Sequence, residues 1–293
     1  MNHAGEQVVV IGAGLGGLMT ALELAPRPVL LLSRSPLGRE VATAWAQGGI
    51  AAALAAGDSP ALHAADTLEA GTGTCDGAIV DAVTREAPGT VARLERYGVA
   101  FDRASDGQLA LGREGGHGRR RIAHARDATG DAITRALVGA ARRTASITIL
   151  EGVDVRELLQ EDGRIVGLAA VRGAERLLVC APAVVLATGG AGGLYAHTSN
   201  PLGARGEGFV MAARAGAALA DLEFVQFHPT AIDVAADPMP LATEALRGEG
   251  ALLVNSLGER FMLGLHPLAE LAPRDIVSRA IFRERAAGRL RGL

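Results

Sequence analysis

Aromatic residues and cysteines are scarce in this chain. Its 293 residues include six Phe, two Tyr, one Trp and two Cys. So few rings offer little surface for stacking nucleobases, on which the binding of single-stranded nucleic acid usually depends. Cys75 and Cys180 fit no metal-binding or redox-active spacing. We therefore expect two reduced thiols without a chemical role, and no metal site.

A strong net charge is also absent. The chain has 29 Lys and Arg against 32 Asp and Glu, for a formal net charge of −3 at pH 7. Binding to a phosphate backbone needs an excess of positive charge, so nucleic acid is excluded as a general partner. The shares of 49% hydrophobic and 21% charged residues are typical of a globular chain, and the length is sufficient for two domains.

Long hydrophobic runs are missing as well. The apolar run at residues 28–32 is far shorter than the roughly 20 residues that cross a bilayer. The short polar N-terminus does not resemble a signal peptide. We therefore expect a cytoplasmic protein without a membrane partner.

Glycine, in contrast, is abundant, and its first cluster follows a strand-like run. Val8–Ile11 is typical of a buried parallel strand, residues 18–25 favour a helix, and residues 29–32 predict a second strand. The glycine motif at the strand-to-helix turn predicts a dinucleotide-binding βαβ unit, with the helix N-terminus facing the phosphates. The predicted cofactor contacts in this turn are Gly12, Ala13, Gly14, Leu15, Gly16 and Gly17.

Three of these glycines have distinct physical reasons. Gly12 permits the tight turn, Gly14 lets the backbone approach a pyrophosphate, and Gly17 lets the helix pack closely on the strand. The acid that usually binds a ribose hydroxyl about 20 residues later is missing, and Ser33 and Arg34 stand there instead. Ser33 can still bond a hydroxyl, but the motif leaves open which dinucleotide binds.

The rest of the chain predicts further alternation of helices and strands. Pro88 should break a helical region into residues 76–85 and 89–96, and Thr129 should cap a helix that runs to Arg142. Asp162-Gly163 predicts a turn between antiparallel strands. The predicted strands are residues 147–150, 153–159, 165–171, 177–179 and 184–187. The pattern weakens from Pro229 onward, which suggests two domains, residues 1–225 and 226–293.

The loop Arg113–Arg121 places one carboxylate, Glu114, among four arginines. Arginine binds carboxylates through two parallel hydrogen bonds, and a lone acid in such a group suits a ligand with an amine as well as carboxylates. An acidic amino acid has this charge pattern. A solvated basic loop is the alternative.

Seven segments together carry a resemblance to a known family. They are Gly12–Gly17, 43–52 (TAWAQGGIAA), 113–121 (REGGHGRRR), 187–190 (ATGG), 226–230 (QFHPT), 243–250 (TEALRGEG) and 272–275 (APRD), in this order. In combination they resemble the succinate dehydrogenase/fumarate reductase flavoprotein family, and within it the aspartate oxidases. The resemblance implies an α/β fold: a Rossmann-like FAD-binding domain with an inserted α+β capping domain. Family members are considerably longer, so we expect the capping domain to be incomplete here.

The resemblance also implies the cofactor, FAD. Respiratory members carry the flavin covalently on a histidine at the position of Ala42, and since alanine has no nucleophile we expect non-covalent FAD. Ser33 and Arg34 should lie near the ribose, Val155 near the adenine, and Glu207 where the family usually has an aspartate. The segment expected near the isoalloxazine ring comprises Thr43, Ala44, Trp45, Ala46, Gln47, Gly48 and Gly49.

The implied reaction is the oxidation of L-aspartate to iminoaspartate, with oxygen or fumarate as acceptor and quinolinate synthase as a partner. Arg274 corresponds to the family's proton acceptor or electrostatic partner, although an arginine is a poor base at its ordinary pKa. Glu114 should face the substrate amine and reject succinate. His228 and Thr243 resemble ligands of the substrate carboxylates, and Arg247 is a further candidate.

Each of these residues also has a structural alternative. His228 could be a satisfied histidine at a strand end, Thr243 a helix cap, and Arg274 a partner of Asp275 or Glu270. For the chain as a whole, the alternatives are a fumarate reductase-like or succinate dehydrogenase-like flavoprotein, or an inactive FAD-binding fragment.

Overall fold

The computed structural model describes residues 7–290, which form two compact units. Unit 1 comprises residues 7–46, 97–99 and 130–224, and unit 2 comprises residues 47–96, 100–129 and 225–290. The predicted boundary at residues 225/226 lies beside the last of these divisions. Residues 47–96 and 100–129, however, group with the C-terminal part, because the chain passes between the units several times. A sequence pattern does not reveal such interleaving.

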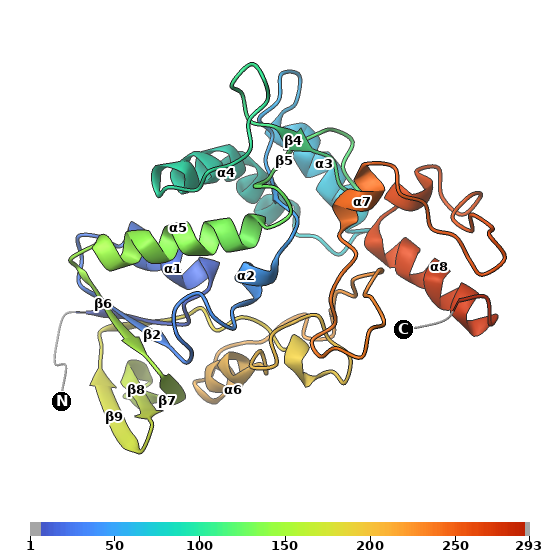
Figure 1. Ribbon diagram of the computed structural model, residues 1–293. Coiled ribbons are helices and arrows are strands. Elements are labelled where there is room, and N and C mark those ends of the chain that lie inside the picture. Colours follow the sequence, from blue (N-terminus) through green and yellow to red (C-terminus); the bar gives the residue numbers. More distant parts are fainter. Residues whose placement is uncertain (1–6, 291–293) are drawn as a thin grey trace. The chain divides into compact units, whose positions relative to one another are not determined.

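Unit 1 is built on a four-stranded parallel sheet of strand order β10-β1-β2-β6. The strands are β1 (Val8–Ile11), β2 (Val29–Ser33), β6 (Ile147–Glu151) and β10 (Ala183–Leu186). Helices α1 (Leu15–Glu23) and α5 (Thr129–Arg143) run along one face of this sheet (Figure 1). The central strands β1 and β2 are buried and almost wholly apolar, as expected where both faces of a sheet are covered.

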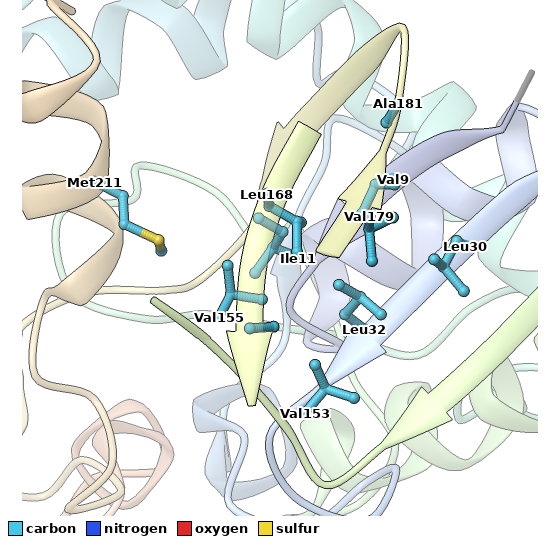
Figure 2. Close-up of a cluster of buried hydrophobic side chains, with 11 residues drawn as sticks. Val9, Ile11, Leu30, Leu32, Val153, Val155, Leu168, Val179, Ala181 and Met211 are labelled. Atoms are coloured by element: carbon cyan, nitrogen blue, oxygen red, sulfur yellow. The ribbon is translucent and has the colours of Figure 1, made fainter. Parts of the chain in front are cut away.

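The other face of the parallel sheet packs on a second, antiparallel sheet. This sheet has the order β7-β8-β9, with bounds Val153–Glu161, Arg164–Arg172 and Glu175–Cys180. Asp162 and Gly163, with φ of 49° and 72°, form the predicted turn between β7 and β8. Alternate residues of β1 and β2 meet side chains of the second sheet in a shared core (Figure 2). Truncating its fully buried Leu168 to alanine would cost about 2–5 kcal/mol of stability.

The core places the carboxyl ends of β1, β2 and β10 at one edge, where the glycine-rich turns follow. The predicted Rossmann-like α/β fold with a parallel sheet is thereby confirmed. The remaining helices of unit 1 are α2 (Ala42–Trp45), α6 (Glu207–Arg214) and a 3₁₀ turn at Gly192–Leu194.

Unit 2 combines short antiparallel strands with helices. Its sheet has the order β3-β5-β4, with bounds Ile50–Ala51, Ile122–Ala123 and Leu111–Gly112. Its helices are α3 (Pro60–Ala70), α4 (Gly77–Arg96), α7 (Glu244–Gly248), α8 (Arg274–Ala286) and a 3₁₀ turn at Ala269–Leu271. A small core of Met262, Ala272, Val277 and Ala280 supports α8.

Two local predictions are wrong. Pro88 lies inside one continuous helix, α4. Proline removes one backbone hydrogen bond and its ring crowds the carbonyl four residues earlier. The buried Thr84, Val91 and Leu94 nevertheless anchor α4 on both sides of it. Thr129 does not cap α5 by accepting from that helix; its Oγ1 accepts from the Ala125 N–H at 2.9 Å instead.

No helix within residues 7–290 has both the length and the apolar composition of a membrane span.

Candidate functional site

A cavity of about 400 Å³ lies in unit 1 at the carboxyl ends of the parallel strands. This is the edge where α/β sheets bind ligands. Ten of the predicted cofactor-binding residues line the cavity. They are Gly12, Ala13, Gly14, Leu15, Gly16, Ser33, Arg34, Thr43, Val155 and Glu207.

The glycines of the first turn divide into packing and lining positions. A Cβ on Gly12, whose φ is +107°, would lie 2.2 Å from the Ala187 oxygen, and one on Gly17 would lie 1.8 Å from the Gly12 oxygen. These two glycines let the turn, α1 and the end of β10 come together. A Cβ on Gly14 would meet only Thr43 Oγ1 at 3.7 Å, and one on Gly16 would meet nothing within 4 Å. Side chains at positions 14 and 16 would therefore fill cavity space.

The first turn of α1 supplies donors to the cavity. Gly14 caps α1 without a side-chain hydrogen bond, so N–H groups of this turn remain available for an anion such as a pyrophosphate. The Leu15 N–H donates to Thr43 Oγ1 at 3.1 Å, which ties the cavity wall to α2. These donors and the glycine cradle fit a dinucleotide such as FAD.

Arg34 lies at the cavity rim between two carboxylates. Its guanidinium is 3.0 Å from Asp154 Oδ1 and 3.1 Å from Glu207 Oε1. Since the charge of Arg34 is paired on both sides, the rim suits a hydroxyl-bearing ribose better than an additional phosphate. Ser33 donates to the Ser35 carbonyl at 2.6 Å and keeps oxygen lone pairs free to accept.

Other predicted cofactor residues lie outside this cavity. Gly17 serves packing, Ala44–Ala46 do not line the cavity, and Gln47–Gly49 belong to unit 2. Their flavin contacts stay predictions. Further residues that the sequence did not predict as cofactor contacts also line the cavity, including Glu40, Asn200 and the second glycine cluster at Thr188–Gly190. That second cluster follows a strand just as the first does, and this was the available signal.

Unit 2 contains a cluster of charged residues around Glu244, on the first turn of α7. Its side chain is 4% exposed, and its oxygens lie 2.5 Å from Arg274 Nε and 3.4 Å from an Arg247 nitrogen. It also accepts from the Gly115 N–H at 3.2 Å. Our prediction did not include Glu244 as a site residue, because on the sequence it appeared only as an acid in the first turn of a helix.

Glu114 belongs to the same cluster. Burial and the nearby Glu244 raise the pKa of its carboxyl, whereas Arg274 and a hydrogen bond from the Gly49 N–H oppose that rise. A Cβ on Gly48 would lie 2.8 Å from Glu114 Oε1, so glycine there permits the close approach. Among the residues that the structure describes, Glu114 has no salt-bridge partner. This partly desolvated acid suits a group that receives a cation.

His228 is neutral in this environment. Burial and the nearby Arg274 lower its pKa to about 4. Its Nδ1 accepts from the Thr230 N–H at 3.3 Å, which assigns the proton of the neutral ring to Nε2. The Nδ1 of His228 therefore has a hydrogen-bond partner, in line with the structural alternative, whereas its Nε2–H is a donor for a ligand.

Arg247 and Thr243 flank Glu244 on α7. Arg247 is 4% exposed and donates to the Glu270 carbonyl at 2.6 Å, but its Nε meets no acceptor within the described part of the chain. Burial lowers its pKa, against the attraction of Glu244. Thr243 caps α7 by accepting from the Ala245 N–H at 3.3 Å, so its structural alternative is confirmed.

Arg274 pairs with neither of the partners considered from the sequence. Asp275 binds Arg279, Glu270 binds Arg260, and Arg274 binds Glu244. The cluster as a whole balances two carboxylates, Glu114 and Glu244, against two guanidinium groups. Its donors suit a dicarboxylate, and Glu114 suits an added amine. Within residues 7–290, no group of His, Cys, Asp and Glu side chains is arranged to hold a metal ion.

Comparison with known proteins supports this assignment of the cavity. Residues 7–291 match the model of the FAD binding domain family. The chain belongs to the FAD binding domain family. Its cofactor is accordingly FAD, as predicted.

The chain is similar to proteins named L-aspartate oxidase. It is 56% identical over 280 residues to that of Agrobacterium fabrum, covering 95% of this chain and 53% of the relative. It is 55% identical over 289 residues to that of Mesorhizobium japonicum, covering 98% and 56%. The predicted resemblance is confirmed, and the chain spans about half the length of these relatives.

A solved structure extends the likeness to the respiratory branch. The structure of an E. coli quinol fumarate reductase matches with a TM-score of 0.90 at 31% identity, over 99% of this chain and 52% of that one. This match confirms that the fold is that of the flavoproteins in the predicted family.

Proposed function

We propose that this chain supplies the FAD-binding and dicarboxylate-binding parts of an L-aspartate oxidase. The reaction is the FAD-dependent oxidation of L-aspartate to iminoaspartate, with oxygen or fumarate reoxidising the cofactor. The observation that carries the proposal is Glu114, a desolvated carboxylate beside Arg274 and Arg247. The names of the relatives that are 55–56% identical support it.

The residues of unit 2 divide the binding of aspartate between them. The guanidinium groups of Arg274 and Arg247 pair with its carboxylates, and the Nε2–H of His228 donates to a carboxylate oxygen. Thr243 can donate its hydroxyl proton to the substrate while its oxygen continues to accept from the Ala245 N–H. Glu114 pairs with the ammonium group.

The placement of Glu114 predicts a preference for aspartate over succinate. Succinate has no cation to offer, so Glu114 would lie buried beside two further carboxylates, and an unpaired buried charge is costly. Aspartate removes that cost because its ammonium group balances Glu114.

The chemistry of oxidation comes from the cofactor, since FAD, when bound, accepts two electrons and a proton from an amine substrate. The chain's own contribution is to bind the cofactor in unit 1 and to orient the dicarboxylate in unit 2. Arg274 is held by Glu244 in a fixed position, and we assign it the electrostatic role toward the substrate.

The product extends the proposal to a pathway. Iminoaspartate is the precursor of quinolinate, so the reaction is the first step of de novo NAD biosynthesis, and quinolinate synthase is the proposed partner that accepts this unstable imine. We place the reaction in the cytoplasm as part of the same proposal.

A fumarate reductase-like activity is the second candidate, and the TM-score of 0.90 to a fumarate reductase favours it. Ala42, which replaces the family's flavin-carrying histidine, and Glu114 argue for the aspartate reaction instead. A third possibility is a fragment that binds FAD without turnover.

The choice of electron donor, aspartate or succinate, separates these three candidate functions. The purified, FAD-loaded chain should lose its yellow colour under anaerobic conditions with L-aspartate and keep it with succinate. Bleaching by succinate alone would support the second candidate and overturn the first. A yellow protein that neither donor bleaches would be the inactive fragment.

A further inference from the structure

The loop that carries Glu114 is a nine-residue hairpin, Arg113–Arg121, between β4 and β5. Its base is closed by the Arg121 N–H, which donates to the Gly112 carbonyl at 3.0 Å. Its tip is a turn in which the His117 N–H donates to the Glu114 carbonyl at 3.3 Å, with Gly116 at φ +78°. This geometry is that of a type II turn, which requires a positive φ at the third position.

Neither the turn nor the base fixes the whole loop against the rest of unit 2. Glycines make up three of its nine residues, and Arg119 and Arg120 are exposed. A loop of this composition needs external contacts to keep one conformation.

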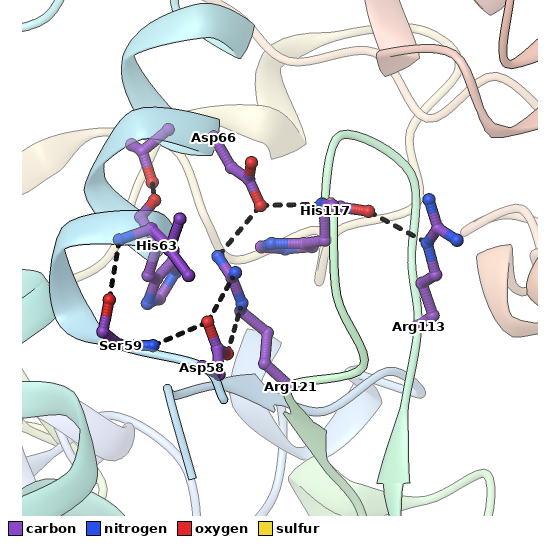
Figure 3. A network of polar contacts seen from close by, with 10 residues as sticks. Asp58, Ser59, His63, Asp66, Arg113, His117 and Arg121 are labelled. Carbon is purple, nitrogen blue, oxygen red and sulfur yellow. Dashed lines mark hydrogen bonds and ion pairs between the residues drawn. The ribbon is translucent and has the colours of Figure 1, made fainter. Parts of the chain in front are cut away.

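The side of the loop that faces α3 is held by one carboxylate. Asp66 Oδ2 accepts from the Gly118 N–H at 2.7 Å and lies 3.0 Å from Arg121 Nη1. A second aspartate, Asp58, binds Arg121 through two parallel hydrogen bonds of 3.0 Å. Figure 3 shows both aspartates around the Arg121 guanidinium, whose side chain is 0% exposed.

The imidazole rings of His63 and His117 fill the space beside this network. Their centroids are 5.7 Å apart, and burial lowers the pKa of both rings, so both are neutral near pH 7. His63 comes from α3 and His117 from the loop tip. The two rings therefore pack the loop against α3 without adding charge.

Asp58 and Asp66 have different consequences for the loop. The side chain of Asp58 is fully buried and contacts the base of the hairpin through Arg121, which makes it part of the fold of unit 2. The side chain of Asp66 is 21% exposed. Asp66 is the aspartate that binds the loop backbone itself, at Gly118, which is four residues after Glu114.

We propose that Asp66 is a positioning residue for Glu114. Through Gly118 and Arg121 it holds the loop so that Glu114 stays against Gly48 and Gly49, and it thereby sets the preference for an amino-dicarboxylate over a plain dicarboxylate. The second half of this statement rests on the proposed function, whereas the first half concerns the loop alone.

Two variants test the proposal. Asp66→Ala removes both contacts, and Asp66→Asn keeps an oxygen for the Gly118 N–H but removes the charge that faces Arg121. The matched control is Asp81→Asn, an exposed aspartate of α4 that pairs with Arg85 and does not contact the loop.

The first measurement is amide hydrogen exchange of the FAD-loaded protein, resolved at Gly49 and Gly115. Asp66→Ala removes the charged acceptor of the Gly118 N–H. The loosened loop should then weaken the bonds from Gly49 to Glu114 and from Gly115 to Glu244, and exchange at both amides should be about tenfold faster or more. Asp66→Asn should have a smaller effect and the control none. Unchanged exchange at both amides in a folded Asp66→Ala protein would overturn the proposal. Faster exchange spread evenly over the protein would also overturn it, because that result would indicate a structural role only.

The second measurement is the ratio of succinate to aspartate dissociation constants, read from the flavin absorbance. The ratio should fall about tenfold in Asp66→Ala, while the dissociation constant of FAD, whose cavity lies in unit 1, stays the same. A selective rise in exchange with an unchanged ratio would overturn the specificity half. A wild-type protein without any preference for aspartate would contradict the proposed function, whereas the exchange result would still decide whether Asp66 holds the loop.

Discussion

Glu244 Oε2 lies 2.5 Å from Nε of Arg274, 30 residues further along the chain. Arg274 is the first residue of α8, where the helix dipole disfavours a positive charge. Glu244 offsets that penalty and is itself 4% exposed. Arg274 remains 34% exposed, so part of the guanidinium stays available to a ligand.

Replacing Arg274 by glutamine should abolish aspartate-dependent bleaching of the flavin. Removal of one preorganised charged donor typically costs about 10²–10³-fold in rate. The retention of FAD should not change, because its cavity lies in unit 1. Arg279→Gln, on the same helix and paired with Asp275, is the control. Bleaching by Arg274→Gln within a few-fold of the wild-type rate would refute the role of this arginine.

Removing the charge of Glu114 should stabilise the ligand-free protein at pH 7. The pKa of this carboxyl is raised on folding, so the folded state binds its proton more tightly, and stability is lost as pH rises through the folded pKa. Glutamine keeps an acceptor for the Gly49 N–H without the charge. Thermal melting should show Glu114→Gln above wild type at pH 7, and the difference should vanish below pH 4.5. A lower Tm for the variant at pH 7 would show that Arg274 outweighs burial.

Acidification should destabilise the chain through His228, which is partly buried. The pKa of His228 falls to about 4 on folding, from an ordinary 6.5, so the unfolded state binds more protons between these values and stability falls as pH drops through this window. His228→Gln should reduce the dependence of the unfolding midpoint on pH from 6.5 to 4. The exposed His197→Gln is the control. An unchanged slope in the His228 variant would argue against a buried neutral ring.

Two adjacent glycines should respond differently to alanine. A Cβ on Gly17 would lie 1.8 Å from the Gly12 oxygen, whereas one on Gly16 meets no atom within 4 Å. Gly17→Ala should therefore lower the free energy of unfolding of unit 1 by about 3 kcal/mol or more. Gly16→Ala should fold normally and bind FAD less tightly, because its methyl group enters the cavity. Chemical denaturation and fluorescence titration with FAD measure the two effects, and normal stability of Gly17→Ala would contradict the turn geometry.

The flavin should be released by acid precipitation. Ala42 lines the cavity and offers no atom that can bond to the cofactor. The yellow colour should therefore appear in the supernatant after denaturation with trichloroacetic acid. Flavin fluorescence that stays with the polypeptide on a denaturing gel would contradict a non-covalent site.

The sequence was sufficient for the parts of the fold that depend on neighbouring residues. The β1–α1–β2 unit, its glycine turn and the β7–β8 hairpin followed from local patterns. The charged pairs were not predictable, because Glu244 meets Arg274 across 30 residues and Arg121 meets Asp58 across 63. The loop at Arg113–Arg121 therefore looked like a set of similar arginines, although Arg121 is fully buried and Arg120 is exposed.

The interleaving of the two units was hidden for the same reason. Residues 47–96 follow the first βαβ unit along the chain but fold with residues 225–290. Only long-range contacts reveal where they belong. Asp66 accepts from the Gly118 N–H, and the Gly115 N–H of the same loop donates to Glu244.

The most direct test of the central claim is an anaerobic titration of the FAD-loaded chain with L-aspartate, followed by flavin absorbance and repeated with Glu114→Gln. We predict stoichiometric bleaching of the wild type, and at least a tenfold higher aspartate concentration for half-bleaching of the variant, which corresponds to about 1.4 kcal/mol. Equal responses of the two proteins, or no bleaching of a folded, FAD-loaded wild type, would contradict the account.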